Sequence, residues 1–264
     1  MRKLFPTEFV FQVFSLLIAF IVVHAVYVAV IRPKADAFLA AEQAQVKTDP
    51  NYLQQRSYYV VIRDYEQETC FVLMLWAMAI LAFKGTVTYG QQRQLDHDFF
   101  GLPENAVISI EAAEPLSDRL RNLPAKTRES LLPRILLTAI ERFSATRNVQ
   151  DASNVVHALC ESASERSESE LSIIRYIAWA IPSVGFIGTV RGIGDALAQA
   201  HRAVEGDITG VTQSLGVAFN STFVALLISI VLMFLIHQIQ LMQERLVLDA
   251  ERYCDHRLIR RLKT

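Results

Sequence analysis

The chain has 264 residues, of which 52% are hydrophobic and 20% are charged, with a mean hydropathy of +0.26. This balance is unusual for a soluble domain and predicts a membrane protein. Lys and Arg number 26 against 27 Asp and Glu, so no excess of positive charge indicates a nucleic-acid partner. Cys70, Cys160 and Cys254 lie far apart without CxxC spacing, which predicts unpaired thiols.

Four apolar segments predict four transmembrane helices. Residues 9–31 contain no Asp, Glu, Lys or Arg, which gives a span-length segment too long for the core of a signal peptide, so we expect it to be retained. We expect Pro33 to break this helix. Residues 70–89 form the second span if Lys84 extends its ammonium toward a headgroup layer or a polar crevice. The third and fourth spans are residues 171–200 and 211–236.

The segments between and after these spans also predict helices. Residues 32–69 are polar and predict two helical pieces outside the bilayer, with a turn at residues 49–51. Residues 237–264 predict a helical tail. Residues 90–170 are rich in charge, and their apolar residues recur at steps of three and four, which is typical of a helical domain. One such stripe is Leu131, Ile135, Leu136, Ala139, Ile140 and Phe143. The polar run at residues 162–169 has no helix breaker, so we expect continuous helix there.

Basic residues set the expected orientation. Arg2 and Lys3 precede the first span, and the tail at residues 237–264 is rich in arginine, so the positive-inside rule places both termini in the cytoplasm. Residues 32–69 are then periplasmic, and residues 90–170 are cytoplasmic. The predicted fold class is all-α: a polytopic membrane protein with four transmembrane helices and a helical cytoplasmic domain. Its units are residues 1–31, 32–69, 70–89, 90–170, 171–236 and 237–264.

The third span contains a glycine pattern. Gly185, Gly188 and Gly192 follow Pro182 and lie three and four residues apart, so they share one helix face and allow close packing. Close packing explains the glycines. It leaves Thr189 and the flanking arginines unexplained.

Two motifs resemble those of a known family. The sequence GFIGTVRGI at residues 185–193 resembles the GLLGTVxGI segment of ExbB and TolQ, members of the MotA/TolQ/ExbB proton-channel family. The sequence AFNSTFVAL at residues 218–226 is more loosely similar to the family's ALxxTAxGL run. It departs at Phe223 and Val224, and Val217 stands where many ExbB and TolQ sequences place a glutamate. The four-span order with a domain between the second and third spans resembles that of MotA.

The resemblance implies an assembly in the bacterial inner membrane. It implies a homopentamer around a dimer of a single-span partner of the MotB, TolR or ExbD kind, with contact to lipid and no nucleic acid. The partner would supply a membrane aspartate. The transported ion is H+ or Na+, which the sequence leaves open, and no cofactor is expected.

The polar residues of the last two spans agree with such a shared pathway. Neither residues 171–194 nor residues 211–236 contain Asp or Glu, so these spans have no carboxylate for proton relay. Hydroxyls at Thr189 and Thr222, with Ser221 and Asn220 beside them, can coordinate an ion or orient water. The alternative is that each threonine bonds only to a helix backbone. Pro182 and the three glycines would contribute packing and pore lining.

The remaining polar residues have simpler interpretations. Arg191 and Asp195 have the spacing of an i,i+4 ion pair, and the alternative is that they are charges at the outer mouth of a channel. His24 could relay protons, but a lone histidine in a span is more often structural. The chain contains no HExxH, GxSxG or Walker motif, so we expect no enzyme and no metal site.

The sequence therefore predicts an ion-conducting stator or energy-transducing subunit that converts ion-motive force into mechanical work with its partner. The alternative function is a non-conducting membrane scaffold that assembles a multiprotein complex.

Overall fold

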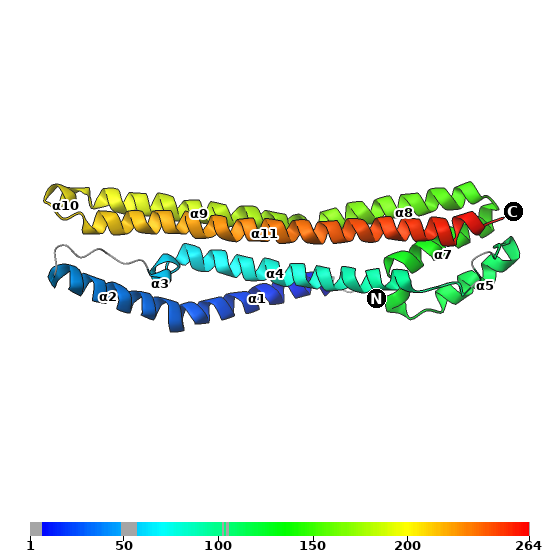
Figure 1. The fold of residues 1–264 in the computed structure, drawn as a ribbon, viewed down its shortest axis with the longest axis horizontal. Helices are drawn as coiled ribbons and strands as arrows, with labels where there is room; N and C mark the ends of the chain where they lie inside the picture. Colours follow the sequence, from blue (N-terminus) through cyan, green and yellow to red (C-terminus); the bar gives the residue numbers. More distant parts are fainter. Residues whose placement is uncertain (1–6, 49–56, 102, 104–105, 264) are drawn as a thin grey trace. The chain divides into compact units, whose positions relative to one another are not determined.

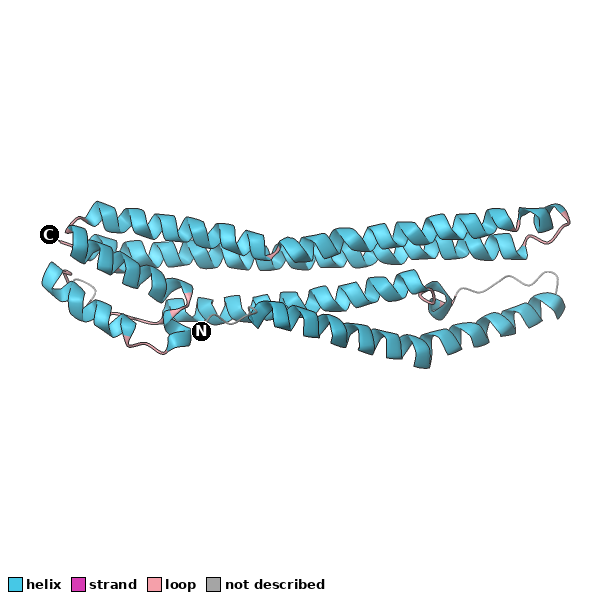
Figure 2. Cartoon of the chain, turned by 180° about the vertical axis from the view of Figure 1, so that it is seen from behind, coloured by secondary structure: helices cyan, strands magenta, loops and turns pink. Residues whose placement is uncertain are grey.

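The computed structural model describes residues 7–48, 57–101, 103 and 106–263. This part of the chain is built from helices and has no β-strand (Figure 2). Four of its helical segments are long and apolar enough to cross a membrane: Phe9–Glu42, Tyr65–Asp96, Val149–Ala198 and Thr209–Arg261. The predicted all-α fold with four spans is confirmed. Arg2 and Lys3 and the expected turn at residues 49–51 lie outside the described residues.

The chain divides into two compact units. The first unit, which we call the membrane unit, is Met1–Leu81 with Ile173–Ile236, and the second, the helical unit, is Ala82–Ser172 with His237–Thr264. Helix α11, Thr209–Arg257, contributes residues to both units and has no break where the fourth span passes into the predicted tail. The apolar run of the span and the periodic spacing of the tail therefore belong to one helix.

The membrane unit contains four long helical segments and their connections. It is formed by α1 (Thr7–Val26), α2 (Arg32–Thr48), α3 (Tyr58–Val61), the first part of α4 (Tyr65–Gln92), α9 (Ser172–Ala198), α10 (Ala200–Val204) and the first part of α11. The indole of Trp76 on α4 donates to the carbonyl of Gln12 on α1 at 2.9 Å. Ser229 on α11 donates to the carbonyl of Ala178 on α9 at 3.1 Å. α9 and α11 lie side by side (Figure 1).

Pro33 does not break the first helix, contrary to the prediction. α1 continues into a π-helical turn, Tyr27–Ile31, and then into α2. The N–H of Arg32 donates to the carbonyl of Tyr27, five residues earlier, so this turn is wider than an α-helical turn. A proline disrupts a helix because it lacks an N–H and its ring collides with the carbonyl four residues before it. The wider turn ends two residues before Pro33 and relieves that collision.

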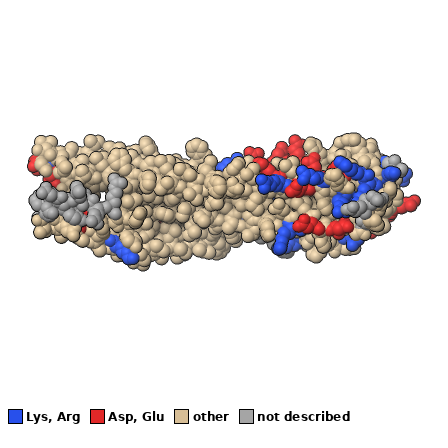
Figure 3. Space-filling model, in the orientation of Figure 1, with Lys and Arg blue, Asp and Glu red and all other residues tan. Residues whose placement is uncertain are grey.

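Large apolar side chains cover the outside of the membrane helices. Phe14, Trp179, Phe186, Ile230 and Phe234 are all more than half exposed, which a soluble unit of this size would not tolerate as a continuous band. In Figure 3 this surface is almost free of charged side chains, whereas charges are dense over the helical unit. The exposed apolar band is the surface that lipid or neighbouring membrane helices cover.

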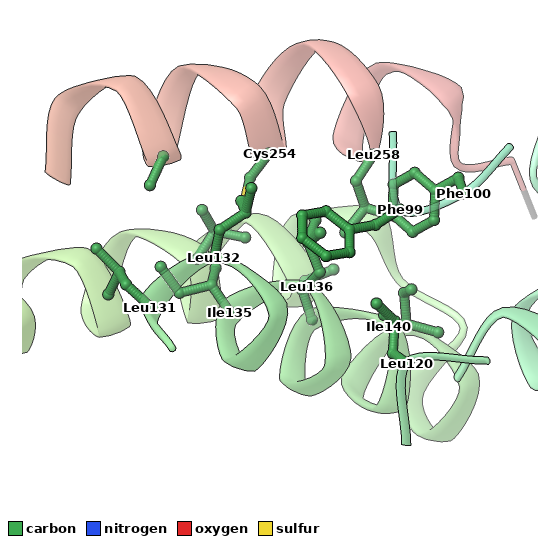
Figure 4. Packing of buried hydrophobic residues seen from close by; sticks show 14 of the residues in the cluster. Phe99, Phe100, Leu120, Leu131, Leu132, Ile135, Leu136, Ile140, Cys254 and Leu258 are labelled. Atoms are coloured by element: carbon green, nitrogen blue, oxygen red, sulfur yellow. The ribbon is translucent and has the colours of Figure 1, made fainter. Parts of the chain in front are cut away.

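The helical unit has a conventional buried core. It contains the end of α4, η2 (Arg93–Asp96), α5 (Ile110–Arg121), α6 (Ala125–Arg128), α7 (Leu131–Thr146), α8 (Val149–Glu170), the end of α11 and η3 (Ile259–Arg261). The predicted stripe from Leu131 to Phe143 is buried in full. It packs against Phe99 and Phe100 and against the end of α11 through Cys254 and Leu258 (Figure 4).

Three further expectations concern the polar run, Lys84 and the cysteines. The polar run at residues 162–169 is helical, as predicted, and α8 ends at a turn on Leu171. Lys84 is buried, and its ammonium lies 2.6 Å from Oε2 of Glu170. It therefore pairs with a carboxylate of the protein, which is the polar surrounding that the prediction required. Cys70, Cys160 and Cys254 are free and buried.

Candidate functional site

Helices α9 and α11 meet along the three glycines of the motif. A Cβ added to Gly188 would lie 2.5 Å from Cβ of Ser221, and one added to Gly192 would lie 2.7 Å from the carbonyl oxygen of Ser214. A Cβ on Gly185 would overlap the methyl group of Ala225. No atom other than hydrogen fits at these positions, so the glycines let the two backbones approach closely. We call this contact the glycine seam.

The residues of α11 that face the seam are small. Ser214, Ala218, Ser221 and Ala225 are spaced by four, three and four residues, so they follow one face of the helix. Pro182 lies in α9 one turn before Gly185, and the helix continues through it. Small residues on both helices therefore form the seam, as they do in closely packed membrane bundles.

Thr189 and Thr222 meet beside the seam. Their hydroxyl oxygens are in hydrogen-bonding contact across the two helices. Thr189 Oγ1 also lies 3.0 Å from the carbonyl oxygen of Ala218, and Thr222 Oγ1 lies 3.1 Å from that of Gly185. The backbone-bonding alternative therefore describes part of this geometry, but each threonine bonds to the facing helix as well as to its hydroxyl partner.

The two hydroxyls have more acceptors than hydrogens. Each hydroxyl carries one hydrogen, and the pair faces two carbonyl oxygens in addition to the contact between the hydroxyls themselves. Thr189 Oγ1 also lies 3.4 Å from the carbonyl oxygen of Gly185 on its own helix, so only two of these four interactions can be donated at one time. The pair can therefore exchange donors without moving either helix, and its oxygen lone pairs can accept from water or face a cation.

The other predicted pathway residues are placed differently. Ser221 is buried against Gly188 and donates to the carbonyl of Val217 at 2.9 Å. Asn220 lies two residues before Thr222, which is about 200° around the helix. The structure thus brings Thr189, Thr222 and Ser221 together and leaves Asn220 on another face of α11.

Arg191 is not paired with Asp195, contrary to the preferred prediction. Its Nε donates to Oε1 of Glu66 at 2.7 Å, and its Nη2 donates to Oε2 at 2.8 Å. This bidentate geometry is the strongest form of an arginine–carboxylate pair. Asp195 lies four residues farther along α9 and is exposed. Arg191 therefore pairs with a carboxylate from α4 and not with the acid that lies one turn away on its own helix.

Glu66 was missed as a site residue because the sequence assigns it to the polar segment before the second span. In the structure it lies in the first turn of α4, and its side chain is 11% exposed. Its Cγ lies 3.1 Å from the position of a Cβ on Gly188. The only signal in the sequence was a pair of glutamates, Glu66 and Glu68, directly before an apolar run. Residues 171–194 and 211–236 contain no acid, but α4 brings one to the seam.

A second carboxylate of α4 binds the first span. Glu68 is 8% exposed, and its Oε1 lies 2.6 Å from Nδ1 of His24 while its Oε2 pairs with Arg32. His24 is therefore not a lone histidine in this fold. Just before α4, burial raises the pKa of Asp64, an effect that Arg63 and Arg191 partly offset. Among the described residues, no three His, Cys, Asp or Glu side chains converge as a metal site requires.

The comparisons with known proteins point to the same part of the chain. Residues 127–252 match the MotA/TolQ/ExbB proton channel family. The match runs from α6 to within α11 and contains the glycine seam and both threonines. Neither the curated proteins nor the solved structures gave a match. Residues 127–252, just under half of the chain, are therefore similar to the MotA/TolQ/ExbB proton channel family.

Proposed function

We propose that this chain is the channel-forming subunit of an ion-driven stator or energy-transducing complex. The observation that carries the proposal is the contact between Thr189 and Thr222 at a glycine seam inside the family-matched segment. Two hydroxyls with spare lone pairs are held between the closely packed helices α9 and α11. Such a pair suits an ion or an ordered water.

The proposal includes a partner and an assembly. A homopentamer of this chain surrounds a dimer of a single-span protein of the MotB, ExbD or TolR kind, whose membrane aspartate carries the ion past the threonine pair. Proton or sodium flow turns the assembly stepwise and delivers mechanical work. The complex lies in a bacterial inner membrane with both termini of this chain in the cytoplasm, as the basic tail favours.

The test is ion flux in liposomes that contain the chain and its single-span partner, purified as a complex. Thr189→Val with Thr222→Val removes both hydroxyls at nearly constant volume, and we expect it to stop the flux while the complex persists on size exclusion. The matched control is Thr212→Val. The hydroxyl of Thr212 bonds to the carbonyls of Thr209, the first residue of α11, and of Ile208, the residue before the helix, and so makes no contact between helices. Normal flux in the double variant would contradict the channel proposal.

A non-conducting scaffold is the competing function. It uses the same seam for assembly and requires no hydroxyl, so it predicts a wild-type complex without measurable ion flux. The flux of the unmodified complex therefore separates the two functions before any variant is made.

A further inference from the structure

Glu66, Gly188 and Ser221 lie at one level of the membrane unit, where α4, α9 and α11 meet. The absent side chain of Gly188 leaves room that Glu66 Cγ fills from one side and Ser221 from the other, at 3.1 Å and 2.5 Å from the position of a Cβ. Thr189 follows Gly188 directly in sequence. Glu66 thus reaches the seam at the level of the hydroxyl pair, and a larger residue at position 188 would displace it.

Glu66 is an acid in an apolar setting with one partner for both oxygens. Its side chain is 11% exposed, and Arg191 occupies Oε1 and Oε2 together. Ionisable groups at the margin of an apolar span are costly to place, so they are functional candidates with a named partner.

We propose that Glu66 is a proton-carrying acid supplied by this chain and that Arg191 makes the pathway select H+ over Na+. This inference rests on the proposed channel function, and it names the ion and the residues that choose it. The selection follows from the bidentate contact. A sodium ion would have to share the carboxylate with a fixed guanidinium charge at ion-pair distance, whereas a proton forms a covalent bond to oxygen and removes the charge from Glu66.

The proton-transfer step balances without any other reactant. A proton binds one carboxylate oxygen of Glu66, an O–H bond forms, and the ion pair with Arg191 opens. The carboxyl group then gives the proton to water at the threonine pair, from which the partner's carboxylate takes it. Glu66 returns to the charged form and rebinds Arg191, so each cycle moves one proton and leaves the chain unchanged.

The other charged groups near Glu66 lie on its own segment, on α9 and at Arg63. On its own segment these are Asp64 and Glu68, and Glu68 is occupied by His24 and Arg32. On α9 they are Arg191 itself and Asp195, one turn beyond it. Arg63 lies against both Asp64 and Asp36. Among these groups, Arg191 alone has its guanidinium hydrogen-bonded to Glu66.

The experiment uses the complex with its single-span partner in liposomes, under a pH gradient without Na+ and under a Na+ gradient at equal pH. We expect Glu66→Gln to lower proton flux at least tenfold, while Glu66→Asp, which keeps the acid, stays within about threefold of wild type. We expect Arg191→Gln to admit Na+, which the wild type excludes. Glu205→Gln, an exposed carboxylate in the loop before α11, is the matched control and should change neither flux.

A second measurement separates failure of this inference from failure of the channel function. Infrared difference spectra of the full-length chain in nanodiscs should show a protonated carboxyl signal on acidification that Glu66→Gln lacks. A wild-type complex without ion flux would overturn the channel function. A wild-type proton flux that Glu66→Gln leaves intact, or an infrared signal that it retains, would overturn the role of Glu66. Exclusion of Na+ by Arg191→Gln would overturn the selectivity.

Discussion

Lys84 and Glu170 form a buried ion pair within the helical unit, with Nζ 2.6 Å from Oε2 and the lysine side chain 6% exposed. Arg166, one turn earlier on α8, binds the other carboxylate oxygen at 2.8 Å. The pair joins the end of α4, where the second apolar segment ends, to the end of α8, where the third begins. A lysine inside a span is thus neutralised by the protein itself.

We expect the Lys84–Glu170 pair to show a coupling free energy of roughly 1–3 kcal/mol in a double-mutant cycle of Lys84→Met and Glu170→Gln, because the lysine is desolvated. The measurement is the free energy of unfolding in detergent. The control cycle uses Arg121 and Glu141, an exposed pair at 2.7 Å, for which a smaller coupling is expected because solvent screens it. Equal coupling in the two cycles would show that burial of Lys84 contributes nothing.

Gly185→Ala should destabilise the membrane unit, since its methyl group would overlap that of Ala225. Overpacking of this kind costs about 1–3 kcal/mol. The double variant Gly185→Ala with Ala225→Gly removes the overlapping methyl group and should recover most of the loss. Gly194→Ala is the control, because no atom lies within 4 Å of its Cβ position. The readout is the midpoint of thermal unfolding followed by circular dichroism, and failure of the rescue would argue against a direct contact between positions 185 and 225.

Asp98 should give the helical unit a measurable acid sensitivity. Burial acts to raise the pKa of Asp98, but the backbone N–H groups of Gly101 and Phe100, at 3.1 and 3.0 Å from Oδ1, lower it below its usual range. The folded pKa is depressed, so the stabilisation is complete above the unfolded value of about 3.9 and is lost as pH falls through the folded value.

We expect this stabilisation to be about 1 kcal/mol, because Asp98 is exposed and partly screened. Asp98→Asn keeps an acceptor without a charge and should remove this pH dependence. Thermal unfolding of the two proteins from pH 3 to pH 7 tests the prediction, which fails if their stability difference is the same at every pH.

Glu68→Gln should loosen the first span from the second. It removes the charge that Arg32 and His24 share and leaves a partly buried guanidinium without its counter-ion, at a cost below the roughly 3–5 kcal/mol of a fully buried pair. Hydrogen exchange of the α1 amides should accelerate. Asp36→Asn breaks an exposed pair with Arg63 at 3.2 Å and should have little effect on α1. Matching exchange rates in the two variants would contradict a specific role for Glu68.

Periodicity was sufficient to predict the helices, because burial of one helix face leaves a local trace in the sequence. The stripe from Leu131 to Phe143 shows this: its spacing identified the core face of α7 before any partner helix was known. The small residues of the seam left a similar trace at Gly185, Gly188 and Gly192. Both features depend on spacing within one helix.

Contacts between helices could not be predicted in the same way. Arg191 and Asp195 have ideal local spacing, yet the guanidinium binds Glu66, which is 125 residues away in sequence. Glu68 and His24 are likewise joined only by the packing of α4 on α1. The partner of a charged side chain is set by the tertiary packing, which can bring together residues far apart in sequence. The spacing of residues in a single sequence indicates only contacts within one helix.

The π-helical turn at Tyr27–Ile31 makes the first span sensitive to its length. This turn holds one residue more than an α-helical turn would, and it lies between His24 and Arg32, which share the carboxylate of Glu68. A relative with a single deletion here would restore a regular helix and rotate one of these side chains by about 100° relative to the other. An alignment gap of one residue before Pro33 would therefore mark relatives in which Glu68 binds either the histidine or the arginine, but not both.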